Sequence, residues 1–250
     1  ADQPLELVCA DWSMRAEAGG DGLLPLALAA QDRDFAFRLR ATPGKPLVLQ
    51  GERGLSRKSD APGNASIYYS LTRLALAGTV VVDGRSHEVE GLGWIDREWS
   101  TSALGPDQVG WDWFSLQLDD GSDLMWYRLR RRDGTADPWS RGLLVDRDGT
   151  GTTLDPAEVQ VEPRGAWTSP DGLATYPAAF RLIGTSPSFD LEVTPLLADQ
   201  ELHTLVRYWE GAVGVRGTRA GRPVTGRGYL EMTGYTRSGD DADAQRRNTK

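Results

Sequence analysis

The feature that most constrains the fold of this chain is an alternation of apolar and polar residues with a period of two. In one segment, Phe35, Phe37 and Leu39 alternate with alanine and arginine, as expected of a β-strand with one buried face. The same alternation, bounded by turn residues, recurs along the chain. The predicted strands cover residues 35–40, 79–83, 86–89, 111–118, 123–130, 142–146, 158–162, 179–183, 189–194, 212–216 and 227–233.

The turn residues between these segments predict antiparallel neighbours. Asp83-Gly84 suits the tight primed turn of a hairpin, and the 29 Gly and 14 Pro suit many turns and few long helices. The one candidate helix, Leu23–Ala30, is interrupted by Pro25. We therefore predict an all-β fold in which a meander closes into a barrel. Closure with about eight strands leaves room for one small ligand and removes exposed edges.

Two strand-rich blocks are separated by Ala103–Asp107, where Ala-Leu-Gly-Pro-Asp interrupts the alternation. We place residues 1–104 in a first domain and residues 105–237 in a second. The second block is long enough for a complete barrel, whereas the first is short for one. Residues 238–250 are polar and unpatterned, which predicts a disordered tail.

The composition argues against several kinds of partner and cofactor. With 36 acidic and 28 basic residues the net charge is −8, whereas a surface that binds nucleic acid normally carries excess positive charge. The spacing of Cys9, His87 and His203 matches no zinc motif, and the sequence has no phosphate-binding loop. We expect no nucleic acid, no metal and no cofactor.

The sequence contains little information about compartment. No apolar run is long enough for a transmembrane helix. A single cysteine cannot form an intrachain disulfide. No charged and then apolar leader opens the sequence, so either the protein is not exported or the leader has been removed.

Aromatic residues stand next to carboxylates with unusual frequency, and the chain has 9 Trp. In a strand, Trp94, Asp96 and Glu98 would share one face, and Trp111 and Trp113 would share another. The same combination occurs in the segments 208–211 (Tyr-Trp-Glu-Gly) and 228–231 (Gly-Tyr-Leu-Glu).

Two interpretations of this pattern remain open. In the first, the aromatic rings fill the interior of a barrel and the carboxylates pair with nearby arginines. In the second, the rings line an apolar pocket in which one carboxyl group is kept protonated and acts as an acid. Such an acid can protonate an isolated C=C bond, and ring faces stabilise the carbocation that results. The same pocket would also suit simple binding of a polyene or lipid.

An ordered series of motifs resembles the AttH and carotenoid 1,2-hydratase (hydroxyneurosporene synthase) family, from about Trp12 to Tyr235. The series is far more specific than any one of its members. The motifs are 54–58 (GLSRK), 62–66 (PGNAS), 68–70 (YYS), 72–74 (TRL), 94–100 (WIDREWS), 110–114 (GWDWF), 199–201 (DQE), 208–211 (YWEG), 228–231 (GYLE) and 233–235 (TGY).

This resemblance implies two tandem lipocalin-like antiparallel β-barrels. The motifs are closer to the AttH-like branch, whose members are associated with transporter systems of the bacterial envelope, than to the hydratases. Family members usually carry a further stretch before the equivalent of Trp12, with a Glu-Trp-Trp-Tyr-like motif that this sequence lacks. We therefore expect the first barrel to be incomplete at its N-terminus.

The first functional hypothesis is a lipocalin-like protein that binds an apolar small molecule or lipid in a β-barrel cavity. It would act in the bacterial periplasm or cell envelope, with an ABC-type transporter system as a partner. The alternative is a hydro-lyase that adds water to a C=C bond of a carotenoid or other isoprenoid. The candidate acids are Asp96, Glu98 and Glu210, and the candidate ligand-binding residues are Tyr68, Trp94, Trp99, Trp111, Trp113, Tyr208 and Trp209.

Overall fold

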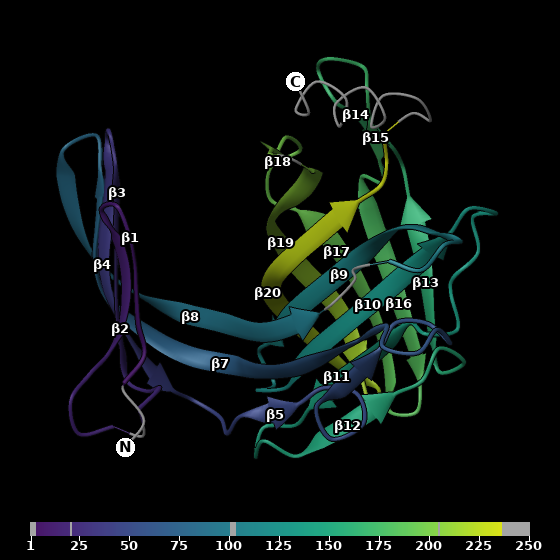
Figure 1. The fold of residues 1–250 in the computed structure, drawn as a ribbon, viewed down its shortest axis with the longest axis horizontal. Helices are drawn as coiled ribbons and strands as arrows, with labels where there is room; N and C mark the ends of the chain where they lie inside the picture. Colours follow the sequence, from purple (N-terminus) through teal and green to yellow (C-terminus); the bar gives the residue numbers. More distant parts are fainter. Residues whose placement is uncertain (1–3, 21, 101–103, 205, 237–250) are drawn as a thin grey trace. The chain divides into compact units, whose positions relative to one another are not determined.

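The computed structural model describes residues 4–20, 22–100, 104–204 and 206–236, and these residues form β-strands without any helix (Figure 1). The prediction of an all-β fold is therefore confirmed. No described segment could cross a membrane as an apolar helix. The chain divides into two compact units, Ala1–Val48 with Ser70–Asp96, and Leu49–Tyr69 with Arg97–Lys250. Residues 49–69 thus group with the later part of the chain, unlike the division at residue 104 drawn from the sequence, and the tail predicted at 238–250 lies outside the described residues.

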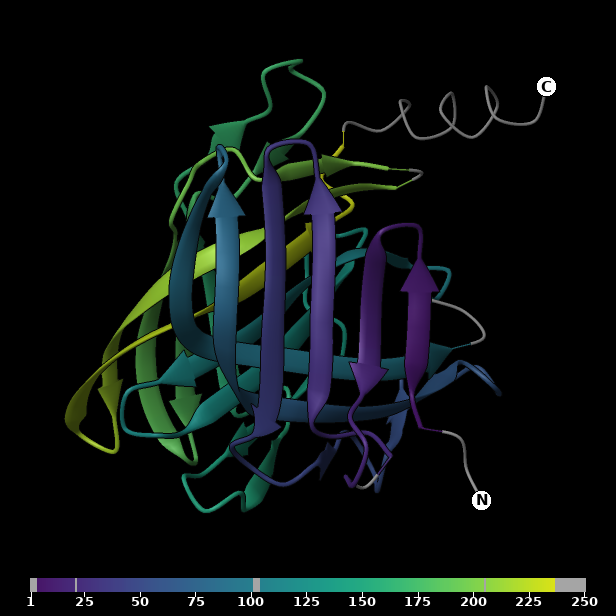
Figure 2. The same ribbon diagram turned by 90° about the vertical axis from the view of Figure 1, so that its left-hand side faces the viewer.

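The first unit contains an open antiparallel half-barrel, as expected for an incomplete first domain. Its first four strands lie side by side in chain order in Figure 2. Residues 26–30 of the segment considered as a helix belong instead to a strand, β3. The strands are β1 (Glu6–Cys9), β2 (Trp12–Ala16), β3 (Leu26–Asp32) and β4 (Phe35–Pro43), followed by β7 (Ala65–Val82) and β8 (Arg85–Ser100), which continue into the second unit.

The hairpin predicted at Asp83-Gly84 connects β7 and β8. Both residues have positive φ angles, 50° for Asp83 and 73° for Gly84. A type I′ turn requires this conformation at both central positions, and its twist matches that of the flanking strands. Local turn chemistry therefore accounts for this connection.

The second unit contains a nearly closed antiparallel barrel. Its strand order is β12-β11-β10-β9-β20-β19-β17-β16-β13, with β18 paired to β19 and a separate ribbon of β14 and β15. The bounds are β9 (Gln108–Leu118), β10 (Asp123–Arg131), β11 (Arg141–Val145), β12 (Gly151–Leu154), β13 (Val159–Arg164), β14 (Trp167–Thr168), β15 (Thr175–Tyr176), β16 (Ala179–Thr185), β17 (Ser188–Pro195), β18 (Glu201–His203), β19 (Arg207–Arg219) and β20 (Arg222–Thr233). The short strands β5 (Val48–Leu49) and β6 (Leu55–Arg57) belong to the sheet that contains β7.

Large side chains pack together inside the second barrel. Phe114, Trp126 and Trp209 are each at most 2% exposed and belong to one apolar cluster. The ring of Phe114 meets that of Phe180 edge to face, with centroids 5.2 Å apart. Because Phe114 points inward, the alternation along β9 places Trp111 and Trp113 on the outer face of the barrel. These two tryptophans therefore do not line its interior.

A charged network lies among the inward-facing side chains. Asp112 is fully buried and accepts hydrogen bonds from Arg128 Nε at 2.8 Å and from the Tyr235 hydroxyl at 2.7 Å. The guanidinium of Arg130 lies 3.7 Å from the centre of the Tyr235 ring, and its Nε is 3.5 Å from Asp112. Two cations and a phenol thus surround one carboxylate, which offsets the cost of burying its charge.

The network predicts a loss of stability at alkaline pH. Burial, followed by the negative charge of Asp112, raises the pKa of Tyr235 above its ordinary value of 10.0. Above about pH 10 the unfolded chain loses this proton while the folded chain keeps it, so stability falls as pH rises. Compared with Tyr235→Phe, the wild type should lose up to about 1.4 kcal/mol more per pH unit. Urea unfolding between about pH 8 and 11.5 would measure this, and parallel curves for the two proteins would contradict it.

Candidate functional site

The outer face of the second barrel carries aromatic rings and carboxylates side by side. The six residues come from strands β9, β19 and β20, and we call them the aromatic–acid face. Five of the six are half-buried, although an outer barrel position usually faces water. The aromatic–acid face consists of Trp111, Trp113, Tyr208, Glu210, Tyr229 and Glu231.

Strand register places the two carboxylates of this face together. Glu210 and Glu231 are directly opposite each other in the β19–β20 pair, so their side chains project from neighbouring points of one face. Trp111 Nε1 donates a hydrogen bond to Glu231 Oε1 at 2.6 Å, and the ring of Trp111 meets that of Tyr208 with centroids 6.4 Å apart. Two acidic side chains therefore lie side by side within reach of aromatic rings.

Burial and the two carboxylates raise the pKa of both tyrosines of this face. Burial raises the pKa of Tyr208 above its ordinary value, and the charges of Glu231 and Glu210 raise it further. Burial followed by Glu210 and Glu231 raises the pKa of Tyr229 in the same way. Both phenols therefore stay protonated at neutral pH, and the face combines hydroxyl donors, ring surfaces and a carboxylate pair.

A second cluster adjoins this face through Trp113. Trp113 Nε1 donates to the Tyr68 hydroxyl at 3.0 Å, and Tyr68 is only 1% exposed. The ammonium of Lys58 lies 5.4 Å from the centre of the Tyr68 ring and 4.0 Å from that of Tyr127. The same ammonium forms an ion pair with Glu98 at 2.9 Å. We call this set the Lys58 cluster; it comprises Ser56, Lys58, Ser66, Tyr68, Glu98 and Tyr127.

Trp94 and Asp96 meet in the first unit, as their positions on one strand face predict. Trp94 Nε1 donates to Asp96 Oδ1 at 2.8 Å, and the Ser70 hydroxyl donates to the same oxygen at 2.5 Å. The pair is half-buried. Asp96 is thus an acceptor beside an indole ring, and its proposed role as an acid stays a prediction.

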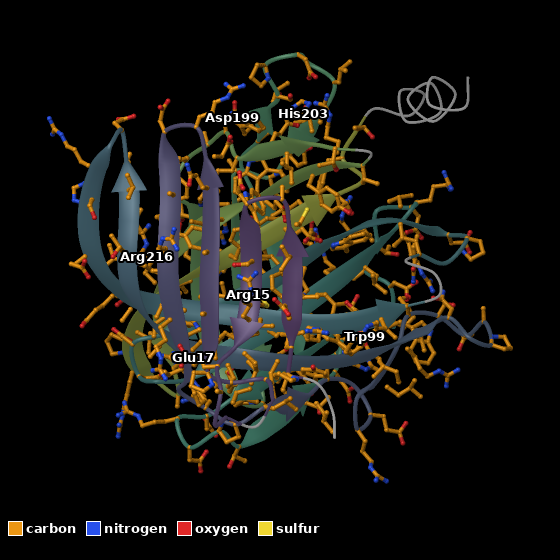
Figure 3. The ribbon with its side chains drawn as sticks, turned by 60° about the vertical axis from the view of Figure 1, so that its left-hand side comes forward. Arg15, Glu17, Trp99, Asp199, His203 and Arg216 are labelled. Atoms are coloured by element: carbon orange, nitrogen blue, oxygen red, sulfur yellow. The ribbon has the colours of Figure 1, made fainter. Side chains whose placement is uncertain are left out.

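Trp99 and Trp209 lie in surroundings unlike those of the other candidates. Trp99, labelled in Figure 3, is 51% exposed, and its ring contacts Tyr69 and the guanidinium of Arg97. Trp209 is 1% exposed inside the second barrel, where its Nε1 donates to the carbonyl oxygen of Ala198. Trp209 therefore belongs to the apolar core, on the strand face opposite to Tyr208 and Glu210.

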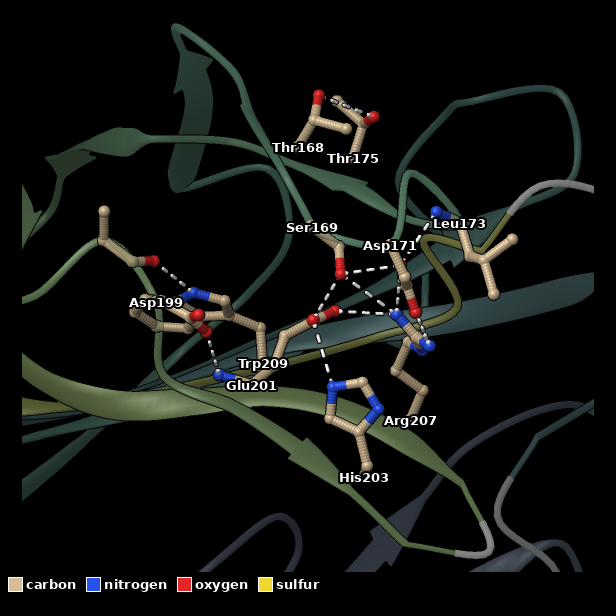
Figure 4. Close-up of polar contacts among 11 residues, drawn as sticks. Thr168, Ser169, Asp171, Leu173, Thr175, Asp199, Glu201, His203, Arg207 and Trp209 are labelled. Carbon is tan, nitrogen blue, oxygen red and sulfur yellow. Dashed lines mark hydrogen bonds and ion pairs between the residues drawn. The ribbon is translucent and has the colours of Figure 1, made fainter.

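A separate polar network ties the β14–β15 ribbon to β18 and β19 (Figure 4). The side chain of Glu201 is 2% exposed, pairs with Arg207 at 3.2 Å and accepts a hydrogen bond from Ser169 at 2.5 Å. Hydrogen bonds from Arg207 hold the pKa of Asp171 well below its usual range. Ser169 and His203 both contact Glu201 rather than each other, so they do not form a nucleophile–base pair. We assign this network a structural role.

Several members of the two clusters were not among the predicted site residues. Glu231 and Tyr229 repeat the pattern of aromatic next to carboxylate, and that pattern could have identified them. Lys58 and Ser66 carry no such signal, because their roles depend on the approach of residues distant in sequence. No group of three or more His, Cys, Asp or Glu side chains suited to a metal ion occurs in the described part of the chain.

Comparisons with known proteins agree with this architecture. The chain is similar to the crystal structure of an AttH protein from Nitrosomonas europaea, with 38% identity and a TM-score of 0.82, over 93% of this chain and 70% of that one. Kievitone hydratase from Nectria haematococca has 18% identity and a TM-score of 0.75 over 93% and 71%. CghA, in complex with Sch210972, has 15% identity and a TM-score of 0.59 over 90% and 68%. The last two show the fold alone.

No curated protein gave a significant match. The model of the AttH-like family matches residues 1–235, nearly the whole chain. Together with the fold and the order of the sequence motifs, this match shows that the chain belongs to the AttH-like family.

Proposed function

We propose that this protein binds an apolar small molecule against the aromatic–acid face of its second unit. One observation carries the proposal: four aromatic side chains gather on the outer face of a barrel whose interior is already occupied by a packed core. Rings placed in this way offer a large contact area with little conformational freedom to lose on binding. The contact would lie outside the barrel, rather than in the internal cavity expected from the sequence.

The ring surface would contact the apolar part of the ligand, and the polar groups at its border would orient the ligand. Trp111 and Trp113 are held by hydrogen bonds to Glu231 and Tyr68, so their rings are fixed before a ligand arrives. Binding sites for small molecules commonly combine such apolar surface with a few oriented polar groups.

Retinol provides a direct test because its fluorescence reports an apolar environment. We expect the purified protein to bind retinol and Trp113→Ala to weaken binding about 30-fold, the effect of losing one aromatic anchor worth about 2 kcal/mol. Trp139→Ala is the matched control, because Trp139 is also half-buried in this unit but contacts Arg57 instead. Equal weakening by the two substitutions, or no binding by the wild type, would contradict the proposal.

A second candidate function is hydration of a C=C bond of an isoprenoid. The observation that favours it is the opposed pair Glu210 and Glu231 among three rings. The protonated form of either carboxyl group would stand beside these rings. That proton could pass to an alkene carbon while the rings stabilise the cation.

We also propose that the protein acts in the bacterial periplasm or cell envelope beside an ABC-type transporter system. This proposal comes from the family resemblance. Fractionation of the source cells, followed by detection of the protein with an antibody, would test the location. Recovery of the protein only with cytoplasmic markers would contradict it.

A further inference from the structure

The Lys58 cluster holds a buried cation, the ammonium group of Lys58. Lys58 is 8% exposed, and its ammonium contacts two tyrosine rings and the Glu98 carboxylate. Its backbone is fixed as well, because Gln108 Nε2 donates to the Lys58 carbonyl at 2.7 Å. Tyr127 is held by its contact with the hydroxyl of Ser56 at 3.1 Å. The cluster therefore sets the position of the Lys58 ammonium within narrow limits.

This arrangement engages only one oxygen of Glu98. Oε1 accepts hydrogen bonds from both Lys58 at 2.9 Å and Ser66 at 2.5 Å. Within the described part of the chain, Oε2 accepts none, and the side chain is 35% exposed. An ion pair requires the carboxylate form, which accepts hydrogen bonds and has no proton to donate. Glu98 thus presents one oriented, accessible acceptor.

We propose that Glu98 Oε2 accepts a hydrogen bond from a hydroxyl group of the ligand and so selects alcohols over ethers and hydrocarbons. This inference rests on the proposed function, because it concerns the polar end of the same ligand. A chain of contacts links this face to Glu98, because Trp113 donates to Tyr68, the Tyr68 ring faces the Lys58 ammonium, and that ammonium pairs with Glu98. A polyene alcohol would place its chain on the rings and its hydroxyl on Glu98.

Retinol and retinyl methyl ether provide a matched pair of probes, because they share the polyene and differ in one hydroxyl hydrogen. The wild type should bind retinol about tenfold or more tightly than the ether, since only the alcohol can donate to the carboxylate. Dissociation constants for both would be measured by fluorescence titration under identical conditions.

Glu98→Gln should abolish this preference without removing the side chain. Lys58 and Ser66 both donate toward the Oε1 position, so the amide oxygen is held there and the NH₂ group takes the position of Oε2. That NH₂ group can donate equally to an alcohol or an ether oxygen, so the ratio of dissociation constants should fall to about one. Glu192→Gln is the control, because Glu192 pairs with Arg216 at the surface of the same unit.

The outcomes separate the two proposals. Equal binding of both probes by the wild type, or a preference retained by Glu98→Gln, would overturn the role of Glu98 and leave the aromatic site intact. Binding of neither probe by the wild type would overturn the proposed function and this inference with it. A preference that persists in Glu192→Gln but not in Glu98→Gln supports the assignment.

Discussion

Replacing Asp112 by alanine is expected to lower the free energy of unfolding by about 3–5 kcal/mol. Asp112 is completely buried, and Arg128 Nη2 lies 2.6 Å from it. The side chains of Arg128 and Arg130 are each only 13% exposed. Without the carboxylate these charges would remain away from water with no compensating anion, and this cost is larger than the loss of the hydrogen bonds themselves.

Asp190→Ala is the matched control for this prediction. Asp190 also forms a doubly bonded pair with an arginine, Arg181, at 2.6 and 2.7 Å, but both side chains are about two-fifths exposed. Water can solvate the arginine that is left behind, so we expect a loss of at most about 1 kcal/mol. Urea unfolding followed by tryptophan fluorescence would measure both variants. Similar losses in the two would show that burial of the network contributes little to stability.

The sequence alone could predict the strands and their hairpins, because these depend on local signals. The alternation around Phe35 and the turn at Asp83-Gly84 both correspond to observed elements. The division into compact units could not be predicted in this way. Residues 49–69 group with the second unit, and contacts between segments so distant in sequence leave no periodic trace in either one.

The face of strand β9 that points into the barrel determines where the candidate site lies. Alternation shows that Trp111 and Trp113 share one face and that Asp112 and Phe114 share the other. It does not show which face is buried, and an aspartate normally argues for the solvent side. The structure places Asp112 inside because Arg128 lies opposite it on β10 and supplies a counter-charge. Pairing across strands therefore decided the direction in which the candidate site faces.

The structure changes which carboxyl group is the leading candidate for the proton donor in the hydratase hypothesis. From the sequence, Asp96 and Glu98 are the leading candidates and Glu210 is held in reserve. In the structure Glu98 forms an ion pair with Lys58, which requires its carboxylate form. Glu210 instead stands opposite Glu231 among aromatic rings. This pair becomes the leading candidate for the proton donor, with Asp96 as the rival.

Glu231→Gln and Glu210→Gln should each reduce hydration of an acyclic carotenoid about 10²- to 10⁴-fold, if the protein is a hydratase. In the proposed step a carboxyl proton moves to one alkene carbon, and water adds to the other. The proton lost from that water returns to the carboxylate, so the pair is regenerated. Glutamine preserves the acceptor for Trp111 Nε1, and a loss of activity would therefore report proton transfer rather than unfolding.

Asp96→Asn tests the rival acid in the same assay, which follows the gain of one water by mass spectrometry. Its carboxylate accepts from Trp94 and Ser70, contacts that asparagine can retain through its amide oxygen. Full activity in Asp96→Asn with loss in both glutamine variants would assign the proton to the Glu210–Glu231 pair. The reverse result would return the role to Asp96 and limit the aromatic–acid face to binding, because the rings alone supply no proton.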